Sequence, residues 1–148
     1  MKDFLCFEIA RNPNALEAVN GQLEALLEER QLPAKVVFAV QFALEELVTN
    51  IINYATGASP ESAIRLRLVF SETKLAMEIN YEGDCFDPFA REKPDLDLPL
   101  EDRPVGGLGI HLTGKVMDEC RHSYSGGRNI LEMWKTTKTN NEDLKRKS

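Results

Sequence analysis

The chain has 148 residues, of which 43% are hydrophobic and 28% are charged, an ordinary balance for one globular domain with its own core. Its net charge of −6 argues against a nucleic-acid-binding protein and against a surface for anionic lipid. No apolar run approaches the ~20 residues that span a bilayer, and the N-terminus lacks the apolar core of a signal peptide, so we expect no membrane partner. Cys6, Cys85 and Cys120 are scattered and lack CxxC spacing, which indicates reduced thiols in a cytoplasmic protein.

The first part of the chain predicts one strand followed by two helices. Residues 4–9 form a short β-prone run, expected at or next to a sheet edge. Asn12 can cap a helix over residues 13–30, whose first position is a proline. Pro33 opens a second helix that is apolar around much of its circumference. We expect this helix to be buried and to stop at residues 55–57.

The second part predicts strands on both sides of a long loop. In the first strand, Ile64, Leu66 and Leu68 alternate with other residues, as expected of a sheet with one face in the core. The loop is rich in prolines and acids, and a loop of this length is usually functional or mobile. In chain order, the expected elements are strands over 63–70 and 75–81, the loop over 83–104, a helix over 108–118, and a hairpin of strands 120–124 and 129–135.

The order of these elements predicts an α+β fold. It favours a two-layer α/β sandwich in which helices cover one face of a mixed, mainly antiparallel sheet. It does not show the alternation of a doubly wound parallel sheet. We expect residues 1–136 to form a single domain and the polar residues 137–148 to be a frayed tail.

Glu46 and Asn50 are polar residues within the apolar pattern of the second helix. Their spacing of four places them on one face, one turn apart. Burying a carboxylate without a partner is costly, so we expect a cleft or a metal beside them. Asn50 could offer its oxygen to Mg²⁺, while Glu46 orients or deprotonates an attacking hydroxyl or water. Alternatively, Glu45 and Glu46 lie on the solvated side and Asn50 is an ordinary exposed helix residue.

Gly106, Gly107 and Gly109 close the long loop and open the third predicted helix. A helix N-terminus carries partial positive charge, and its free N–H groups can bind a phosphate. The loop could then close over a triphosphate as a lid. The alternative is that these glycines simply end the loop.

Other candidate residues carry weaker signals. Gly83 follows a central strand, where a glycine permits close approach of the backbone to a flat ligand. Phe86 and Phe89 fit the core better than base stacking. His111 and His122 have no companion at ligand or triad spacing, so we expect structural roles for both.

Together these segments resemble the GHKL superfamily of ATP-binding domains, over roughly residues 4–135. The short single-domain form further resembles the anti-sigma-factor serine kinases of bacterial partner-switching systems. The matching segments are residues 46–55 for the N box, 83–88 for the G1 box, 106–110 for the G2 box, Met117-Asp118-Glu119, and Gly127-x-Asn129.

This resemblance implies a nucleotide held between helices and sheet, with ATP and Mg²⁺ as cofactors. It implies phosphorylation of a serine or threonine on a STAS-domain anti-anti-sigma protein, sequestration of a sigma factor, and a homodimer. Glu46 would be the catalytic base and Asn50 the Mg²⁺ ligand. The nucleotide-binding residues that it implies are Asn50, Asn53, Tyr81, Gly83, Phe86, Gly106, Gly107, Leu108, Gly109 and Ile110.

One departure from the family pattern lies at Tyr81. The family has an aspartate there, whose carboxylate accepts a hydrogen bond from the adenine amino group. Losing that bond would cost ~1.5–3 kcal/mol. A second hypothesis is therefore a non-enzymatic regulator that keeps the fold and binds a protein partner, with nucleotide binding weakened or lost. A third, a histidine kinase module, is disfavoured because no phosphoacceptor-histidine helix or transmembrane sensor precedes the domain.

Overall fold

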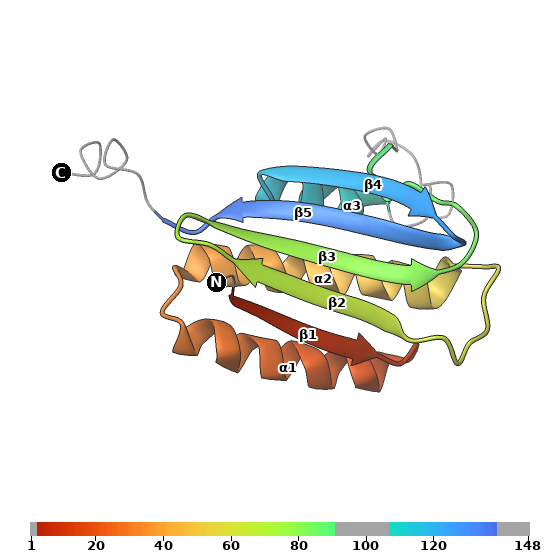
Figure 1. Ribbon diagram of the computed structural model, residues 1–148, viewed down its shortest axis with the longest axis horizontal. Coiled ribbons are helices and arrows are strands. Elements are labelled where there is room, and N and C mark those ends of the chain that lie inside the picture. Colours follow the sequence, from red (N-terminus) through yellow and green to blue (C-terminus); the bar gives the residue numbers. More distant parts are fainter. Residues whose placement is uncertain (1–2, 91–106, 139–148) are drawn as a thin grey trace.

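The computed structural model describes residues 3–90 and 107–138. Most of the long loop predicted from the sequence, including Gly106, lies outside this range, as does nearly all of the predicted tail. Figure 1 shows the arrangement of the elements. In chain order they are β1 (Asp3–Ile9), α1 (Pro13–Glu29), α2 (Ala34–Tyr54), β2 (Ile64–Phe70), β3 (Lys74–Glu82), the 3₁₀ turn η1 (Pro88–Ala90), α3 (Gly107–Val116), β4 (Glu119–Ser125) and β5 (Arg128–Thr136).

The described strands form a five-stranded sheet in the order β1-β2-β3-β5-β4. Every neighbouring pair is antiparallel, so this sheet is simpler than the mixed one expected. All three helices lie on one face of it (Figure 1). The predicted two-layer α+β sandwich is confirmed, with β1 at one edge.

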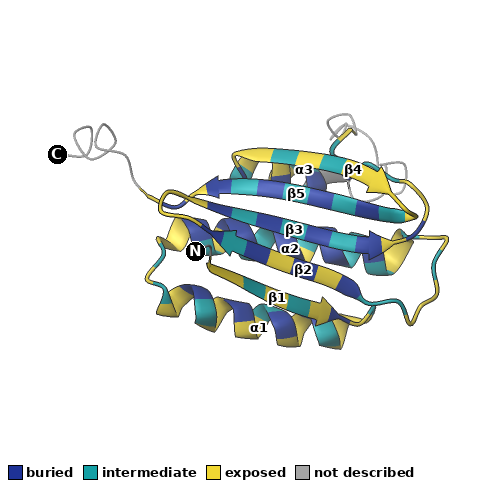
Figure 2. Ribbon diagram, in the orientation of Figure 1, coloured by how far each residue is buried: buried dark blue, intermediate teal, exposed yellow. Residues whose placement is uncertain are grey.

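The core fills the space between the sheet and the helices. Along β2, alternate residues are buried and those between them mostly face outward, as the spacing of Ile64, Leu66 and Leu68 predicted. The same alternation continues through β3 and β5 (Figure 2). Burying each large aliphatic side chain stabilises the fold by about 1.5–3 kcal/mol.

Helix α2 is the central helix of this layer. Among the described residues, it alone is long and apolar enough to cross a membrane, with a mean hydropathy of 1.4, which the sequence analysis did not anticipate. However, 56% of that stretch is buried inside the protein. Its contacts with α1 and α3 and the sheet explain why a core helix has this composition.

Local chemistry sets the ends of several elements. The Oδ1 atom of Asn12 accepts a hydrogen bond from the backbone N–H of Ala15 at 2.8 Å, which confirms the predicted cap of α1. Helix α3 ends at Val116, earlier than predicted. The reason is that the chain turns to the sheet after Val116. The backbone N–H of Asp118 donates to the carbonyl of Trp134 on β5 at 2.9 Å. Gly126 and Gly127 join β4 to β5 with φ of 59° and 77°, the left-handed values that a two-residue hairpin turn needs.

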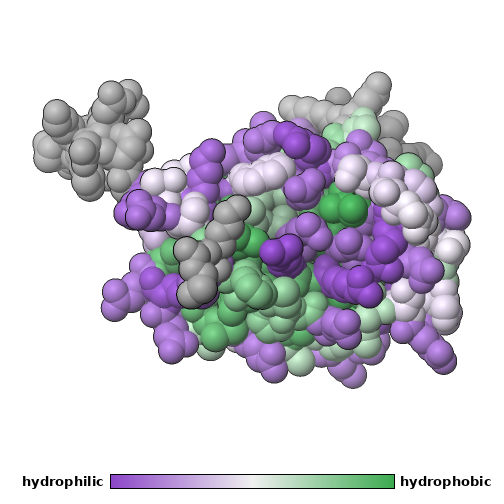
Figure 3. Space-filling model, in the orientation of Figure 1, coloured by the Kyte–Doolittle hydropathy of each residue, from purple (hydrophilic) through white to green (hydrophobic). Residues whose placement is uncertain are grey.

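The outer face of the sheet carries one apolar row. The strand register places Phe4, Val69, Ala76 and Trp134 side by side across four strands. A hydrophobic area is visible on this face in Figure 3. The guanidinium group of Arg67 lies over the Phe4 ring, 5.5 Å from its centre, so one end of the apolar row carries a positive charge.

Candidate nucleotide and phosphoryl-transfer site

The two segments singled out from the sequence meet where α2 packs against α3. Glu46 is half-buried on α2, and its carboxylate lies directly against Gly109 in the first turns of α3. A Cβ atom placed on Gly109 would overlap that carboxylate. The glycine therefore makes room for the acid, and the acid lies near the N-terminal end of a helix, where backbone N–H groups have no partner within the helix.

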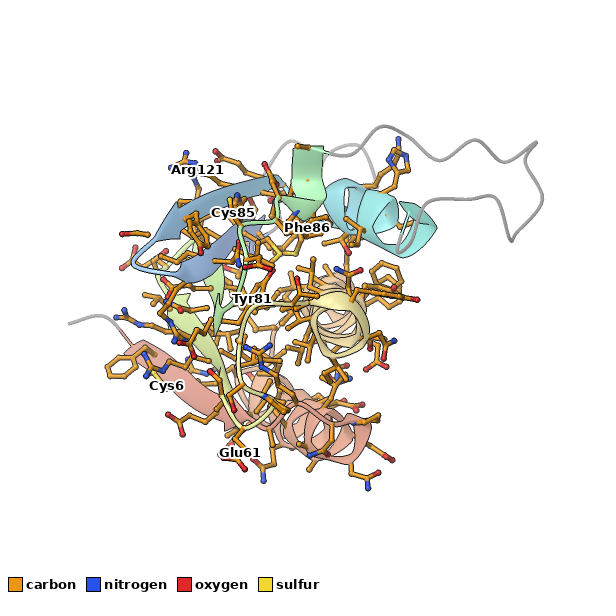
Figure 4. All side chains as sticks on the ribbon, turned by 90° about the vertical axis from the view of Figure 1, so that its right-hand side faces the viewer. Cys6, Glu61, Tyr81, Cys85, Phe86 and Arg121 are labelled. Carbon is orange, nitrogen blue, oxygen red and sulfur yellow. The ribbon has the colours of Figure 1, made fainter. Side chains whose placement is uncertain are left out.

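Asn50 lies one turn further along α2 and lines a pocket of about 270 Å³. The predicted sharing of one helix face by Glu46 and Asn50 is thus consistent with their positions. Neither side chain forms a hydrogen bond or an ion pair with another residue in the described part of the chain. The full lining of this pocket is Asn50, Ile51, Tyr54, Ala55, Thr56, Tyr81, Asp84, Cys85 and Phe86. Figure 4 shows Tyr81, Cys85 and Phe86 beside the end of α2.

The segment after β3 forms one wall of the pocket and is bound to the end of α2. The N–H of Asp84 donates to the carbonyl of Thr56 at 2.8 Å, and the Thr56 hydroxyl donates to Oδ2 of Asp84 at 2.9 Å. Gly83 has φ of 155°, and a Cβ there would lie 2.8 Å from the Thr56 carbonyl oxygen. The close approach that Gly83 permits is therefore to the protein's own backbone.

The same wall is fixed from the other side by Asn129 on β5. Asn129 is fully buried, and its Nδ2 donates to the carbonyl of Asp84 at 2.9 Å. Its Oδ1 accepts from the N–H of Phe86 at 3.0 Å and lies 2.8 Å from Nε2 of His122. Because Oδ1 can only accept, His122 donates from Nε2. The sequence analysis matched Asn129 to a family segment but assigned it no role in the site, although an asparagine among buried strand positions was a visible signal.

Tyr81 also lines the pocket and is only 2% exposed. Burial raises the pKa of its hydroxyl to about 12, partly opposed by the positive charge of Arg11. The Arg11 guanidinium lies 6.0 Å from the centre of the Tyr81 ring and donates to the carbonyls of Ser62 and Glu82, each at 2.7 Å. No local sequence pattern indicates that Arg11 lies here.

The structure does not bring every candidate residue into this site. Asn53 is exposed and lines a separate groove between α1 and α2. It follows Asn50 by three residues, so it is rotated by about 60° around the helix. Ile110 is buried in the core at 4% exposure. Gly107 and Leu108 begin α3, but their side-chain surroundings are not described.

The available oxygen atoms fit a magnesium nucleotide. No group of three or more His, Cys, Asp or Glu side chains forms a metal cluster within residues 3–90 and 107–138. Mg²⁺ does not need one, since it is usually bound through one or two protein oxygens together with substrate phosphates. The carboxamide of Asn50, lining the pocket one turn from Glu46, is suited to that arrangement.

Residues 9–135 match the family described as the histidine kinase-like ATPase domain, and the chain belongs to this family. Among curated relatives, the serine-protein kinase RsbW of Listeria monocytogenes is 21% identical, over 88% of this chain and 86% of that protein. RsbW of Bacillus subtilis is 24% identical, over 84% of this chain and 81% of that protein.

A solved structure supports the same fold. It contains the RsbU and RsbW domains of Rv1364c from Mycobacterium tuberculosis and superimposes with a TM-score of 0.62 at 17% identity. The match covers 90% of this chain and 31% of that chain. At this identity the likeness concerns the fold alone.

Proposed function

We propose that this protein is an ATP-dependent serine/threonine protein kinase and anti-sigma factor. It phosphorylates a STAS-domain anti-anti-sigma protein and sequesters a sigma factor, as a cytoplasmic homodimer. One observation carries the catalytic part of this proposal: Glu46, which has no hydrogen-bond or ion-pair partner among the described residues, lies against Gly109 in the first turn of α3, one turn from Asn50 in the pocket. The RsbW relatives are serine-protein kinases, which supports the same reaction.

The chain's own residues would divide the work as follows. The free N–H groups at the start of α3 would bind phosphate oxygens. The carboxamide oxygen of Asn50 would hold Mg²⁺, which neutralises charge on the transferred phosphate group. The Glu46 carboxylate would orient the serine hydroxyl of the partner and accept its proton. The wall built from Asp84 to Phe86 would enclose the base.

Transfer of labelled phosphate from ATP to a STAS-domain protein of the same organism tests this assignment. We expect Glu46→Gln to lower the transfer rate by about 10²–10⁴-fold, since it removes the proton acceptor while keeping the shape. Glu45→Gln is the matched control, because Glu45 is exposed and lines the groove towards α1. Equal transfer by the wild type and by Glu46→Gln would overturn the assignment.

A second candidate is a non-catalytic regulator that binds its protein partner with nucleotide affinity weakened or lost. Tyr81 favours it, because a phenol stands in the pocket lining where the family pattern has a charged acceptor. In that case, calorimetry would show no nucleotide binding up to about 1 mM. Tyr81→Asp would then create binding, which would identify Tyr81 as the cause of the loss.

A further inference from the structure

A groove of about 560 Å³ lies between α1 and α2. The two helices are joined by residues 30–33 and lie side by side, on the opposite side of α2 from α3 (Figure 1). Along α1 the lining runs from Pro13 to Glu24, which corresponds to about 16 Å or three helical turns. A groove of this length between two helices fits a third helix of about three turns.

The floor of the groove is apolar and its rim is negatively charged. Leu16 is buried and Ile52 is half-buried, whereas Glu17, Glu24 and Glu45 are exposed. None of these three carboxylates forms an ion pair with another residue in ranges 3–90 and 107–138. Among the described residues that line the groove, none is a lysine or an arginine. An occupant that fits is therefore apolar towards the floor and positively charged at its edges.

Gly21 lines the same groove, in the middle of α1 and between the two glutamates of that helix. A glycine inside a helix destabilises it relative to alanine. A Cβ atom at this position would meet no other atom within 4 Å, so packing within the described part of the chain does not require the glycine. Its effect is to leave room for a partner to approach the backbone of α1 closely.

These properties match a helix of a protein that binds nucleic acid, because such proteins carry lysines and arginines that neutralise phosphates. We propose that the groove binds a basic amphipathic helix of the sigma factor. Its apolar side covers Leu16 and Ile52, and its cations, spaced two turns apart, face Glu17 and Glu24. This inference rests on the proposed function, of which it names the surface and the chemistry for one partner.

Calorimetric titration with the sigma factors of the same organism tests the charges. We expect Glu17→Lys combined with Glu24→Lys to weaken binding by at least about tenfold, because like charges then face each other. Glu29→Lys combined with Glu72→Lys is the matched control, since both residues are exposed, lie outside the groove and change the net charge equally. This control should bind within about twofold of the wild type, because distant surface charges are screened.

Gly21→Leu tests the shape of the groove. The new side chain extends into the groove, and leucine is a better helix former than glycine, so the melting temperature should not fall. We expect the affinity for the sigma factor to fall by at least about tenfold, since the close approach is blocked. Ala18→Leu, on an exposed part of α1 outside the groove, should bind as the wild type does.

The outcomes separate this inference from the function beneath it. Equal losses for the two double variants, or unchanged sigma-factor binding by Gly21→Leu, would overturn the inference and leave sequestration intact. If Gly21→Leu instead splits a dimer in sedimentation, or weakens only the STAS-domain protein, the groove has a different occupant and the inference fails. If the wild type binds no sigma factor but still transfers phosphate, the sequestration part of the proposed function fails together with the inference.

Discussion

Gly109 and Gly114, both in α3, have different surroundings. A Cβ on Gly109 would overlap the Glu46 carboxylate, whereas a Cβ on Gly114 would meet no atom within 4 Å. Alanine favours a helix over glycine by about 1 kcal/mol. This pair therefore separates the role of Gly109 in the site from its effect on the helix.

We expect Gly109→Ala to displace Glu46 and to lower phosphate transfer by about 10²-fold, since small misplacements of catalytic groups have such effects. Gly114→Ala should retain full transfer and raise the melting temperature. Transfer assays and thermal unfolding of both variants check this. Undiminished transfer by Gly109→Ala would show that the Glu46 position does not matter.

At the residue scale, the predicted site residues differ in whether they line the pocket. The spacing of Glu46 and Asn50 defines their common face, because helix geometry is regular. Asn53 was predicted as a nucleotide-binding residue because it lies in the matched motif. Its position around the helix places it in the groove between α1 and α2 instead. Tyr81 is buried beside Arg11, which is distant in sequence, so no local pattern could reveal these surroundings.

At the scale of elements, the pocket wall depends on β5. Asn129 bonds to the backbone of Asp84 and Phe86 and to His122, while being fully buried. Removing its side chain takes away the buried partner of these groups. A buried group that loses its partner costs about 1–3 kcal/mol.

Asn129→Ala should therefore lower the free energy of unfolding by at least about 2 kcal/mol in a urea titration and weaken nucleotide binding. Asn20→Ala is a suitable control, since Asn20 lies on α1 and its contacts with Gln41 are at 3.2 Å near the surface. Its effect should stay within about 0.5 kcal/mol. Equal losses for the two variants would contradict the role given to Asn129.

Most elements could be predicted because each follows a period that the sequence displays. The alternation in β2 and the Asn12 cap of α1 were visible before the structure. The end of α3 was not, because a hydrogen bond from Asp118 to Trp134 draws the chain into the sheet. Such a bond joins residues that only the folded chain brings together.

At the scale of the whole molecule, the helical layer and the sheet have different roles. The sheet supplies the base on which the helices pack, and the site lies where α2, α3 and the segment after β3 meet (Figure 4). The outer face of the sheet lies on the opposite side from the helices (Figure 1). A partner bound there would leave the helical layer free. The predicted homodimer and the protein partners stay predictions.

The central claim is that Asn50 and its neighbours bind a magnesium nucleotide. Calorimetric titration with non-hydrolysable ATP and GTP analogues, with Mg²⁺ and with EDTA, tests it most directly. We expect saturable binding that weakens about tenfold without Mg²⁺ or in Asn50→Ala, while Asn53→Ala, altered in the other groove, binds as the wild type does. Absence of heat with both analogues up to about 1 mM would contradict the account.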